Sequence, residues 1–139
     1  MATTEAITIE VGVVFGSGGG RDLLCDIYTP QSGNGIGVLL LYGGGWSRGD
    51  RSRMRDQGMA LSGAGFTCVA GEYRLNGESP WPAQIHDVKA AIRWMRANSE
   101  RLGIDCGDPR PPGLPLTPEQ RVYVLRRAAE LGLSTVAVA

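Results

Sequence analysis

Histidine and cysteine, which supply many catalytic bases and metal ligands, are scarce in this sequence. Histidine occurs once in 139 residues, at His86, so a Ser–His–acid triad, a two-histidine metal site or a histidine relay must use it or be incomplete in this chain. The three cysteines are odd in number and lack Cys-x-x-Cys spacing, which argues against a disulfide framework and against a zinc site. They are Cys25, Cys68 and Cys106.

The sequence also lacks net charge and long apolar segments. Its 14 basic residues balance 14 acidic ones, so no overall field attracts nucleic acid or anionic lipid. The longest apolar runs, such as residues 36–42, are far shorter than the ~20 residues of a membrane span. The first residues carry neither the basic flank nor the apolar core of a signal peptide. We therefore expect a cytoplasmic globular protein without nucleic-acid or membrane partners.

Glycine is abundant, and the segments between its runs predict an α/β fold. The 21 glycines are concentrated at 16–20 and 43–45. Strands are expected at residues 7–15, 22–29, 36–42 and 66–70, and helices at 51–62 and from Pro82 to Gly103. The alternation of strand and helix favours parallel pairing. We predict a mostly parallel sheet flanked by helices, with the N-terminal strands antiparallel.

The second expected helix has one apolar face. Ile85, Val88, Ile92 and Met95 recur at helical spacing, which predicts that this face packs against the sheet. After Asp105 the composition changes, and five of the chain's eight prolines fall within ten residues.

These changes predict three regions. Residues 1–105 form the main domain, 106–118 a Pro-rich loop, and 119–139 a helix with a terminal strand whose origin the sequence does not define. The helix is expected to begin at Pro118, with Thr117 and Gln120 as its capping box.

A loop of three glycines and a tryptophan, Gly43–Trp46, follows the third expected strand. Because glycine has no Cβ, its backbone can take positive φ and bring N–H groups close to a ligand. Ligands of α/β sheets bind at the carboxyl ends of strands, where this loop is expected. Such N–H groups suit acyl transfer, in which negative charge develops on a carbonyl oxygen. The alternative is an ordinary tight turn.

Three segments resemble the esterase/lipase branch of the α/β-hydrolase superfamily. Leu41-Tyr-Gly-Gly-Gly-Trp-Ser-Arg-Gly-Asp50 is similar to that branch's His-Gly-Gly-Gly-Trp loop. Cys25-Asp-Ile-Tyr-Thr-Pro30 resembles its Leu-Asp-Leu-Tyr strand. A third resemblance, to carboxylesterases related to feruloyl and acetyl-xylan esterases, covers Glu72-Tyr-Arg-Leu and the run from Trp81-Pro-Ala-Gln to Asn98. The resemblance covers residues 8–105. It implies a partial α/β-hydrolase fold, ester hydrolysis, and no metal or cofactor.

The resemblance assigns roles to five residues. Gly44 and Gly45 match the backbone donors of the oxyanion hole, and Trp46 matches a wall of the acyl pocket. Tyr42 stands where the family commonly has a histidine that supports the loop. Asp87 matches a buried structural acid on the helix, which would pair with Arg74 or hold a loop amide.

The family's serine nucleophile lies in Gly-x-Ser-x-Gly, and this sequence contains no such pentapeptide. No catalytic residue is therefore identifiable in this chain. The acid and the histidine of the triad should follow the serine, and they are missing as well. A truncated chain, a shifted reading frame or a fusion junction after Asp105 would each explain this pattern, and the sequence does not separate them.

Other conspicuous residues have simpler interpretations. His86 lies in mid-helix and is expected to be a partly buried structural residue, not a catalytic base. The glycines at 16–20 lack the Gly-Lys-Ser/Thr of a phosphate loop and predict a β-turn. The arginines between 48 and 55 are interleaved with acidic residues, which indicates a solvated helix face. Trp81 and Trp94 are expected to be packing residues.

Together these features predict a serine carboxylester hydrolase, acting on small acyl, aryl or carbohydrate-linked esters, that is inactive as this chain because the nucleophile and triad are absent. Its partner would be a small-molecule ester, if the site were completed. Self-association through an exposed sheet edge is also expected. The alternative is a non-catalytic scaffold or binding protein derived from the hydrolase fold.

Overall fold

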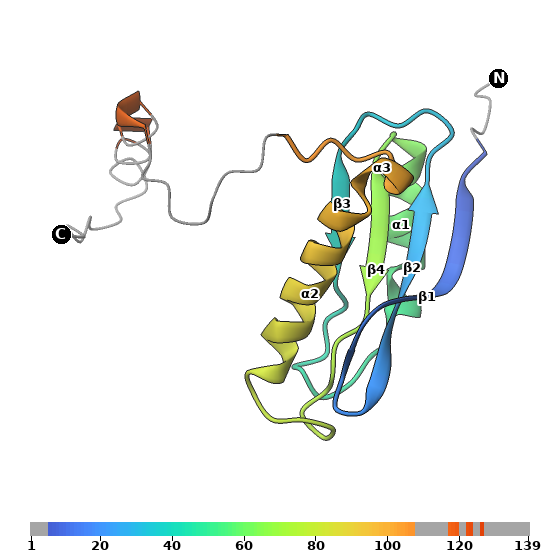
Figure 1. The fold of residues 1–139 in the computed structure, drawn as a ribbon. Coiled ribbons are helices and arrows are strands. Elements are labelled where there is room, and N and C mark those ends of the chain that lie inside the picture. The colour runs from blue at the N-terminus through green and yellow to red at the C-terminus, as the bar shows by residue number, and fades with distance from the viewer. Residues whose placement is uncertain (1–5, 108–116, 120–121, 124–125, 127–139) are drawn as a thin grey trace. The chain divides into compact units, whose positions relative to one another are not determined.

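The computed structural model describes residues 6–107, 117–119, 122–123 and 126. The chain divides into two compact units, Met1–Gly107 and Asp108–Ala139. The first unit is a four-stranded sheet with α1 on one face and α2 on the other (Figure 1). None of the helices in the described ranges has the length and apolar character that a membrane span requires.

The sheet has the strand order β1-β2-β4-β3. Along the chain the elements are β1 (Thr8–Gly18), β2 (Arg21–Thr29), β3 (Gly37–Leu40), the 3₁₀ helix η1 (Arg51–Met54), α1 (Arg55–Gly63), β4 (Thr67–Gly71), α2 (Ala83–Ala97) and α3 (Ser99–Leu102). β1 pairs with β2 and β2 with β4, both antiparallel, while β3 and β4 are parallel.

This pairing confirms the antiparallel N-terminal strands and differs from the mostly parallel sheet that we expected. In the described residues one of the three pairings is parallel. The reason is the connections: only β3 and β4 are joined by a helical crossover, whereas a tight hairpin joins β1 to β2. The hairpin then adds to β4 on the side away from β3.

Side chains that alternate along the central strands form two separate cores. On the α2 face, Cys25 and Ile27 of β2 and Val69 of β4 pack with residues of α2 and α3. On the α1 face, Tyr28 and Cys68 pack with Leu61 and other apolar residues. Every residue of β4 is buried, because helices cover both of its faces.

The buried face of α2 is rotated from the apolar stripe that the sequence predicted. Met95 is buried as expected, but Ile92 is 37% exposed, and Gln84 and Asp87 are among the residues buried in its place. Periodicity counts apolar residues only. The apolar pattern therefore misses polar side chains that are buried and bind neighbouring backbone. Gln84, for example, donates to the carbonyl oxygen of Ser79 at 2.9 Å.

The glycine-rich hairpin is shorter than the expected turn. β1 continues to Gly18, and only Gly19 and Gly20 form the turn, both with positive φ. Gly18 lies against Arg74, so that a Cβ at this position would be 2.7 Å from the guanidinium carbon. The absence of a side chain therefore lets the hairpin tip pack on Arg74.

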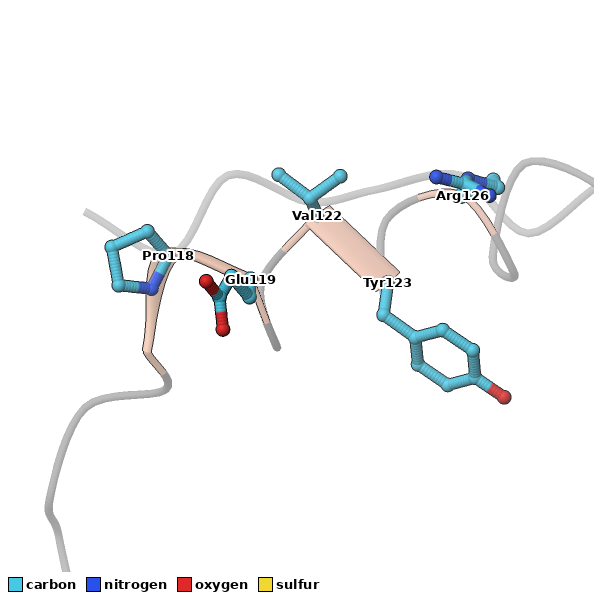
Figure 2. A pocket seen from close by; sticks show the side chains of 5 residues that line it. All are labelled: Pro118, Glu119, Val122, Tyr123 and Arg126. Atoms are coloured by element: carbon cyan, nitrogen blue, oxygen red, sulfur yellow. The ribbon is translucent and has the colours of Figure 1, made fainter.

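In the second unit, the described residues Pro118, Glu119, Val122, Tyr123 and Arg126 have helical backbone. They line a pocket of about 400 Å³ (Figure 2). The Pro-rich residues 108–116, the capping partner at 120 and the expected terminal strand at 133–139 lie outside the described residues.

Two glycines of α1 provide a test of packing on the α1 face. A Cβ at Gly58 would lie 2.7 Å from the ring of Tyr28, whereas one at Gly63 would meet no atom within 4 Å. We expect Gly58→Ala to lower the free energy of unfolding by ~1–3 kcal/mol because of overpacking. Gly63→Ala should leave it unchanged or raise it by up to ~1 kcal/mol. Urea unfolding of both variants measures this, and equal effects would contradict the close helix–sheet contact.

Candidate functional site

The glycine loop lies where β3 and β4 end. These strands are parallel, so the residues that follow them meet at one edge of the sheet. A pocket of about 260 Å³ lies at this edge. It is lined by residues from both strand ends: Leu41, Tyr42, Gly43, Gly44, Gly45, Trp46 and Tyr73.

The pocket brings together four of the five residues that the sequence singled out, and it adds Leu41, Gly43 and Tyr73. Tyr42, Gly44, Gly45 and Trp46 all line it, while Asp87 does not. Tyr73 was not predicted as a site residue. The sequence could have indicated it by position, because it comes two residues after β4. This buried strand is parallel to β3, which carries the loop.

The loop backbone takes conformations that favour glycine. The φ angles of Gly44 and Gly45 are 150° and 62°, and a Cβ on Gly44 would overlap the carbonyl oxygen of Arg48. Ser47 closes the turn, because its N–H and its hydroxyl both donate to the carbonyl oxygen of Gly44, at 3.2 and 3.1 Å. Neither Gly44 nor Gly45 donates its N–H to another described residue.

Two tyrosines join the ends of the parallel strands. The rings of Tyr42 and Tyr73 are stacked, with centroids 4.6 Å apart. Each hydroxyl donates to the other residue's carbonyl oxygen, from Tyr73 at 2.6 Å and from Tyr42 at 3.4 Å. Burial raises the pKa of both phenols, so both stay protonated donors at neutral pH. Tyr42 thus connects the start of the glycine loop to the segment that follows β4.

Trp46, the last residue of the loop, contacts the segment that follows β4. Its carbonyl oxygen accepts a hydrogen bond from the N–H of Asn76 at 2.8 Å. Its ring makes edge contacts with Tyr73, at a centroid distance of 5.3 Å, and with Trp81, at 6.4 Å. The expectation that Trp81 is a packing residue was wrong: it is 64% exposed, beside Trp46, which is 45% exposed.

Asp87 holds the chain after β4 by three hydrogen bonds. Its carboxylate accepts from the backbone N–H of Arg74 at 2.9 Å and from the Arg74 guanidinium at 2.9 and 2.8 Å. Both expected contacts, the arginine and the loop amide, are therefore present. This hydrogen bonding raises the pKa of Arg74. His86, next to Asp87 on α2, is exposed and not partly buried as predicted.

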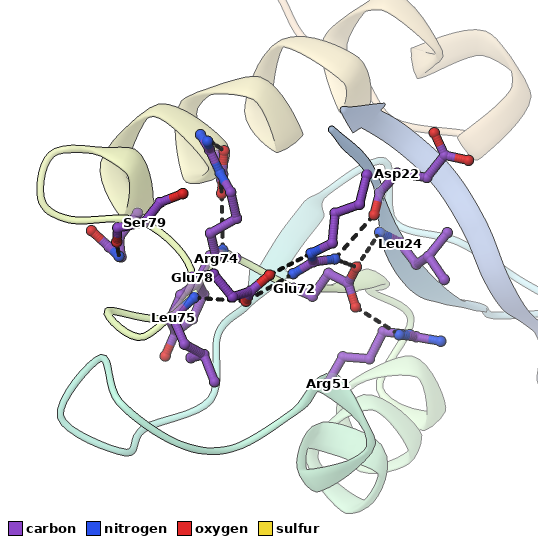
Figure 3. A network of polar contacts seen from close by, with 12 residues as sticks. Asp22, Leu24, Arg51, Glu72, Arg74, Leu75, Glu78 and Ser79 are labelled. Atoms are coloured by element: carbon purple, nitrogen blue, oxygen red, sulfur yellow. Dashed lines mark hydrogen bonds and ion pairs between the residues drawn. The ribbon is translucent and has the colours of Figure 1, made fainter. Parts of the chain in front are cut away.

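A second network ties the loops to the β1–β2 hairpin (Figure 3). Glu72 lies between Arg21 and Arg51, with ion-pair distances of 2.7 and 2.9 Å. Arg51 also pairs with the buried Asp26 at 2.8 Å, so the prediction of a solvated face for the arginine cluster was wrong at this residue. Arg51 instead anchors η1, which follows the glycine loop, to the sheet. Glu78 belongs to the same network, because it accepts a hydrogen bond from Arg21. This bond lowers the pKa of the Glu78 carboxyl.

The described residues contain no group of His, Cys, Asp and Glu side chains arranged to hold a metal ion. Cys25 and Cys68 are buried free thiols, and burial raises the pKa of Cys25 to about 12. Neither thiol is therefore a nucleophile at neutral pH.

This α/β architecture, with a glycine loop at the carboxyl end of a parallel strand, is that of an esterase-type α/β-hydrolase domain. Residues 25–108, more than half of the chain, match the protein family BD-FAE, and the chain belongs to this family.

Several similar proteins of known name are esterases. The chain is 38% identical over 97 residues to carboxylesterase NlhH of Mycobacterium tuberculosis, which covers 65% of this chain and 30% of NlhH. Esterase LipC of the same organism is 38% identical over 72 residues, 49% of this chain and 17% of LipC. The solved structure of esterase Est2 from Thermogutta terrifontis superposes with a TM-score of 0.61 at 26% identity, over 73% of this chain and 37% of Est2. The chain thus spans well under half the length of these relatives.

The glycine loop itself can be tested by two neighbouring substitutions. At Gly44 a methyl group would overlap the Arg48 carbonyl, whereas at Gly43 it would meet no atom within 4 Å. We expect Gly44→Ala to lower the free energy of unfolding by ~1–3 kcal/mol. Gly43→Ala should change it by less than ~0.5 kcal/mol. Thermal unfolding measures both, and a tolerated Gly44→Ala would contradict the loop geometry.

Proposed function

We propose that this chain carries the oxyanion-binding part of a serine carboxylesterase active site. The observation that supports this most directly is the glycine loop. It follows a strand of the parallel pair, and the N–H groups of Gly44 and Gly45 serve no other described residue. Membership of the BD-FAE family and similarity to named carboxylesterases agree with the proposal.

In the proposed reaction, the acyl carbon of an ester lies in the pocket with its carbonyl oxygen on the loop. When a serine hydroxyl attacks that carbon, negative charge develops on the oxygen, and the N–H groups of Gly44 and Gly45 stabilise it. One such donor contributes ~3–4 kcal/mol in the transition state. This sequence has no Gly-x-Ser-x-Gly, so we propose that the nucleophile, its acid and its histidine come from sequence outside this chain.

The pocket favours a small substrate. Its volume of about 260 Å³ is below the ~300–1,000 Å³ that is usual for drug-sized ligands. Its lining is aromatic, aliphatic and glycine, without a charged side chain. We therefore propose an uncharged acyl or aryl ester, free or linked to a carbohydrate.

The free thiols Cys25 and Cys68 agree with a reducing compartment such as the cytoplasm.

The proposal predicts different activities for the chain alone and for a completed site. The 139-residue chain should neither hydrolyse p-nitrophenyl acetate nor be labelled by a fluorophosphonate, because it lacks the nucleophile elbow. A hybrid, in which residues 25–105 replace the matching segment of NlhH, should hydrolyse the ester. In the hybrid, Gly44→Ala should reduce kcat/KM by ~10²-fold or more, and Gly43→Ala by far less.

Two outcomes would overturn this proposal. One is turnover by the chain alone with a covalently labelled serine. The other is a folded hybrid that hydrolyses no ester, since the donor geometry would then lack the proposed role.

We also propose that this chain self-associates through β3. Within the described residues the outer edge of β3 has no partner strand, and the flanking Ile36 is 53% exposed. The opposite edge, β1, is interrupted by two register shifts, which hinder pairing with another strand.

Light scattering tests which edge is used. The wild-type chain should have a mass above that of the monomer, and Ile36→Lys should shift it toward the monomer because a charge blocks edge pairing. The control Val11→Lys, at a position on β1 that is 70% exposed, should leave the mass unchanged. A monomeric wild-type chain, or the reverse pattern of variants, would contradict the proposal.

A further inference from the structure

The segment that follows the glycine loop returns to the loop and packs against its first residues. Gly49 has a φ of 114°, and a Cβ at this position would lie 2.7 Å from the ring of Tyr42 and 3.0 Å from the carbonyl oxygen of Gly43. The carbonyl oxygen of Arg48 lies against Gly44 in the same way, because a Cβ on Gly44 would overlap it. These close contacts mean that the returning segment constrains where the loop can lie.

Arg51 comes two residues after Gly49 and is held from two sides. Its Nε donates to the carboxylate of Asp26 at 2.8 Å, and its Nη1 donates to the carboxylate of Glu72 at 2.9 Å, the second of which Figure 3 shows. The side chains of Arg51, Asp26 and Glu72 are 20%, 8% and 14% exposed. Charge-assisted hydrogen bonds that are this little exposed to solvent are stronger than those of a surface ion pair.

The two carboxylates are themselves fixed to the sheet. Asp26 lies in β2 and also accepts from the backbone N–H of Gly12 at 3.0 Å. Glu72 directly follows β4 and also accepts from the backbone N–H of Leu24 at 2.9 Å. Arg51 therefore ties the segment after the glycine loop to the sheet itself.

The connection between Arg51 and Gly49 is short and has a fixed conformation. One residue, Asp50, lies between them. It is the N-cap of η1, and its carboxylate accepts from the backbone N–H of Ser52 at 2.8 Å. A displacement of Arg51 would therefore reach Gly49, and through it the loop, with little loss.

We propose that Arg51 is a positioning residue for the oxyanion loop, which orients the N–H groups of Gly44 and Gly45 without contacting the ester. This inference rests on the proposed function, because it concerns the same two donors. Oxyanion donors act only when they are oriented before charge develops, and a misplacement of ~1 Å can cost ~10²-fold in rate. Arg51 does not line the pocket. Its loss should therefore lower kcat and leave KM almost unchanged.

Amide nuclear magnetic resonance spectra of the 139-residue chain test the positioning without any ester. Arg51→Gln should shift the N–H signals of Gly44 and Gly45, because the returning segment is released. The matched control is Arg21→Gln. Arg21 pairs with the same Glu72, at 2.7 Å, but belongs to the β1–β2 hairpin. This control should leave the two loop signals almost unchanged.

The isosteric variant Asp26→Asn keeps the test valid if Arg51→Gln does not fold. The side-chain oxygen of asparagine can still accept from Gly12, so the variant removes only the charge opposite Arg51. It should shift the same two loop signals, by less than the loss of Arg51 does.

Steady-state kinetics of the hybrid with NlhH test the consequence for catalysis, because its residues 25–105 include Arg51 and both carboxylates. Arg51→Gln should lower kcat for p-nitrophenyl acetate by ~10- to 100-fold and change KM by less than ~2-fold. The control Arg55→Gln removes an exposed arginine four residues further along the chain and should leave both constants unchanged.

Three results would overturn the proposal: loop signals that stay in place in the folded variants, equal shifts in Arg21→Gln, or an Arg51→Gln hybrid with a raised KM and an unchanged kcat. A folded hybrid without activity would instead overturn the proposed function. The spectra need neither ester nor nucleophile, so they report on Arg51 in either case, and the two failures are distinguishable.

Discussion

The parallel pairing of β3 with β4 is the constraint on which the candidate site depends. It places the ends of two strands at one edge, where the stacked pair Tyr42 and Tyr73 joins them by reciprocal hydrogen bonds. The glycine loop leaves from one of these tyrosines, and the segment that reaches Trp81 leaves from the other. Because both phenols are buried and protonated, this connection persists across the neutral pH range.

Buried and partly buried carboxylates bind backbone N–H groups that the hydrophobic core cannot satisfy. Loops and irregular positions of strands leave backbone N–H groups unpaired, and an apolar core offers these groups no partner. Asp87 accepts from the backbone of Arg74, Glu72 from that of Leu24, and Asp26 from that of Gly12. Each of these carboxylates also pairs with an arginine, so its own burial is compensated. The loops around the pocket are therefore ordered by polar contacts with the sheet and α2.

The sequence predicted those parts of this arrangement that depend on local pattern. Strand positions follow from apolar runs, and the glycine loop follows from its composition and its place after a strand. The Asp87–Arg74 contact was accessible through a family resemblance. Tyr73, Arg51 and Trp81 were not, because their environments are created by segments distant in sequence: Arg51 lies opposite Asp26 of β2 only after the chain has folded. Periodicity likewise misplaced Ile92, since it ignores buried polar side chains.

The contacts that shape the glycine loop among the described residues lie within the first compact unit. Ser47 closes the turn, Asn76 holds Trp46, and Arg51 anchors the following helix. Oxyanion donors stabilise a transition state because they are oriented before charge develops. In the proposed site, the strand pair would orient the loop's N–H groups before any charge develops. A nucleophile elbow would then supply the attacking hydroxyl together with the backbone N–H that follows the serine, so the loop would form one part of the oxyanion hole and the elbow the other.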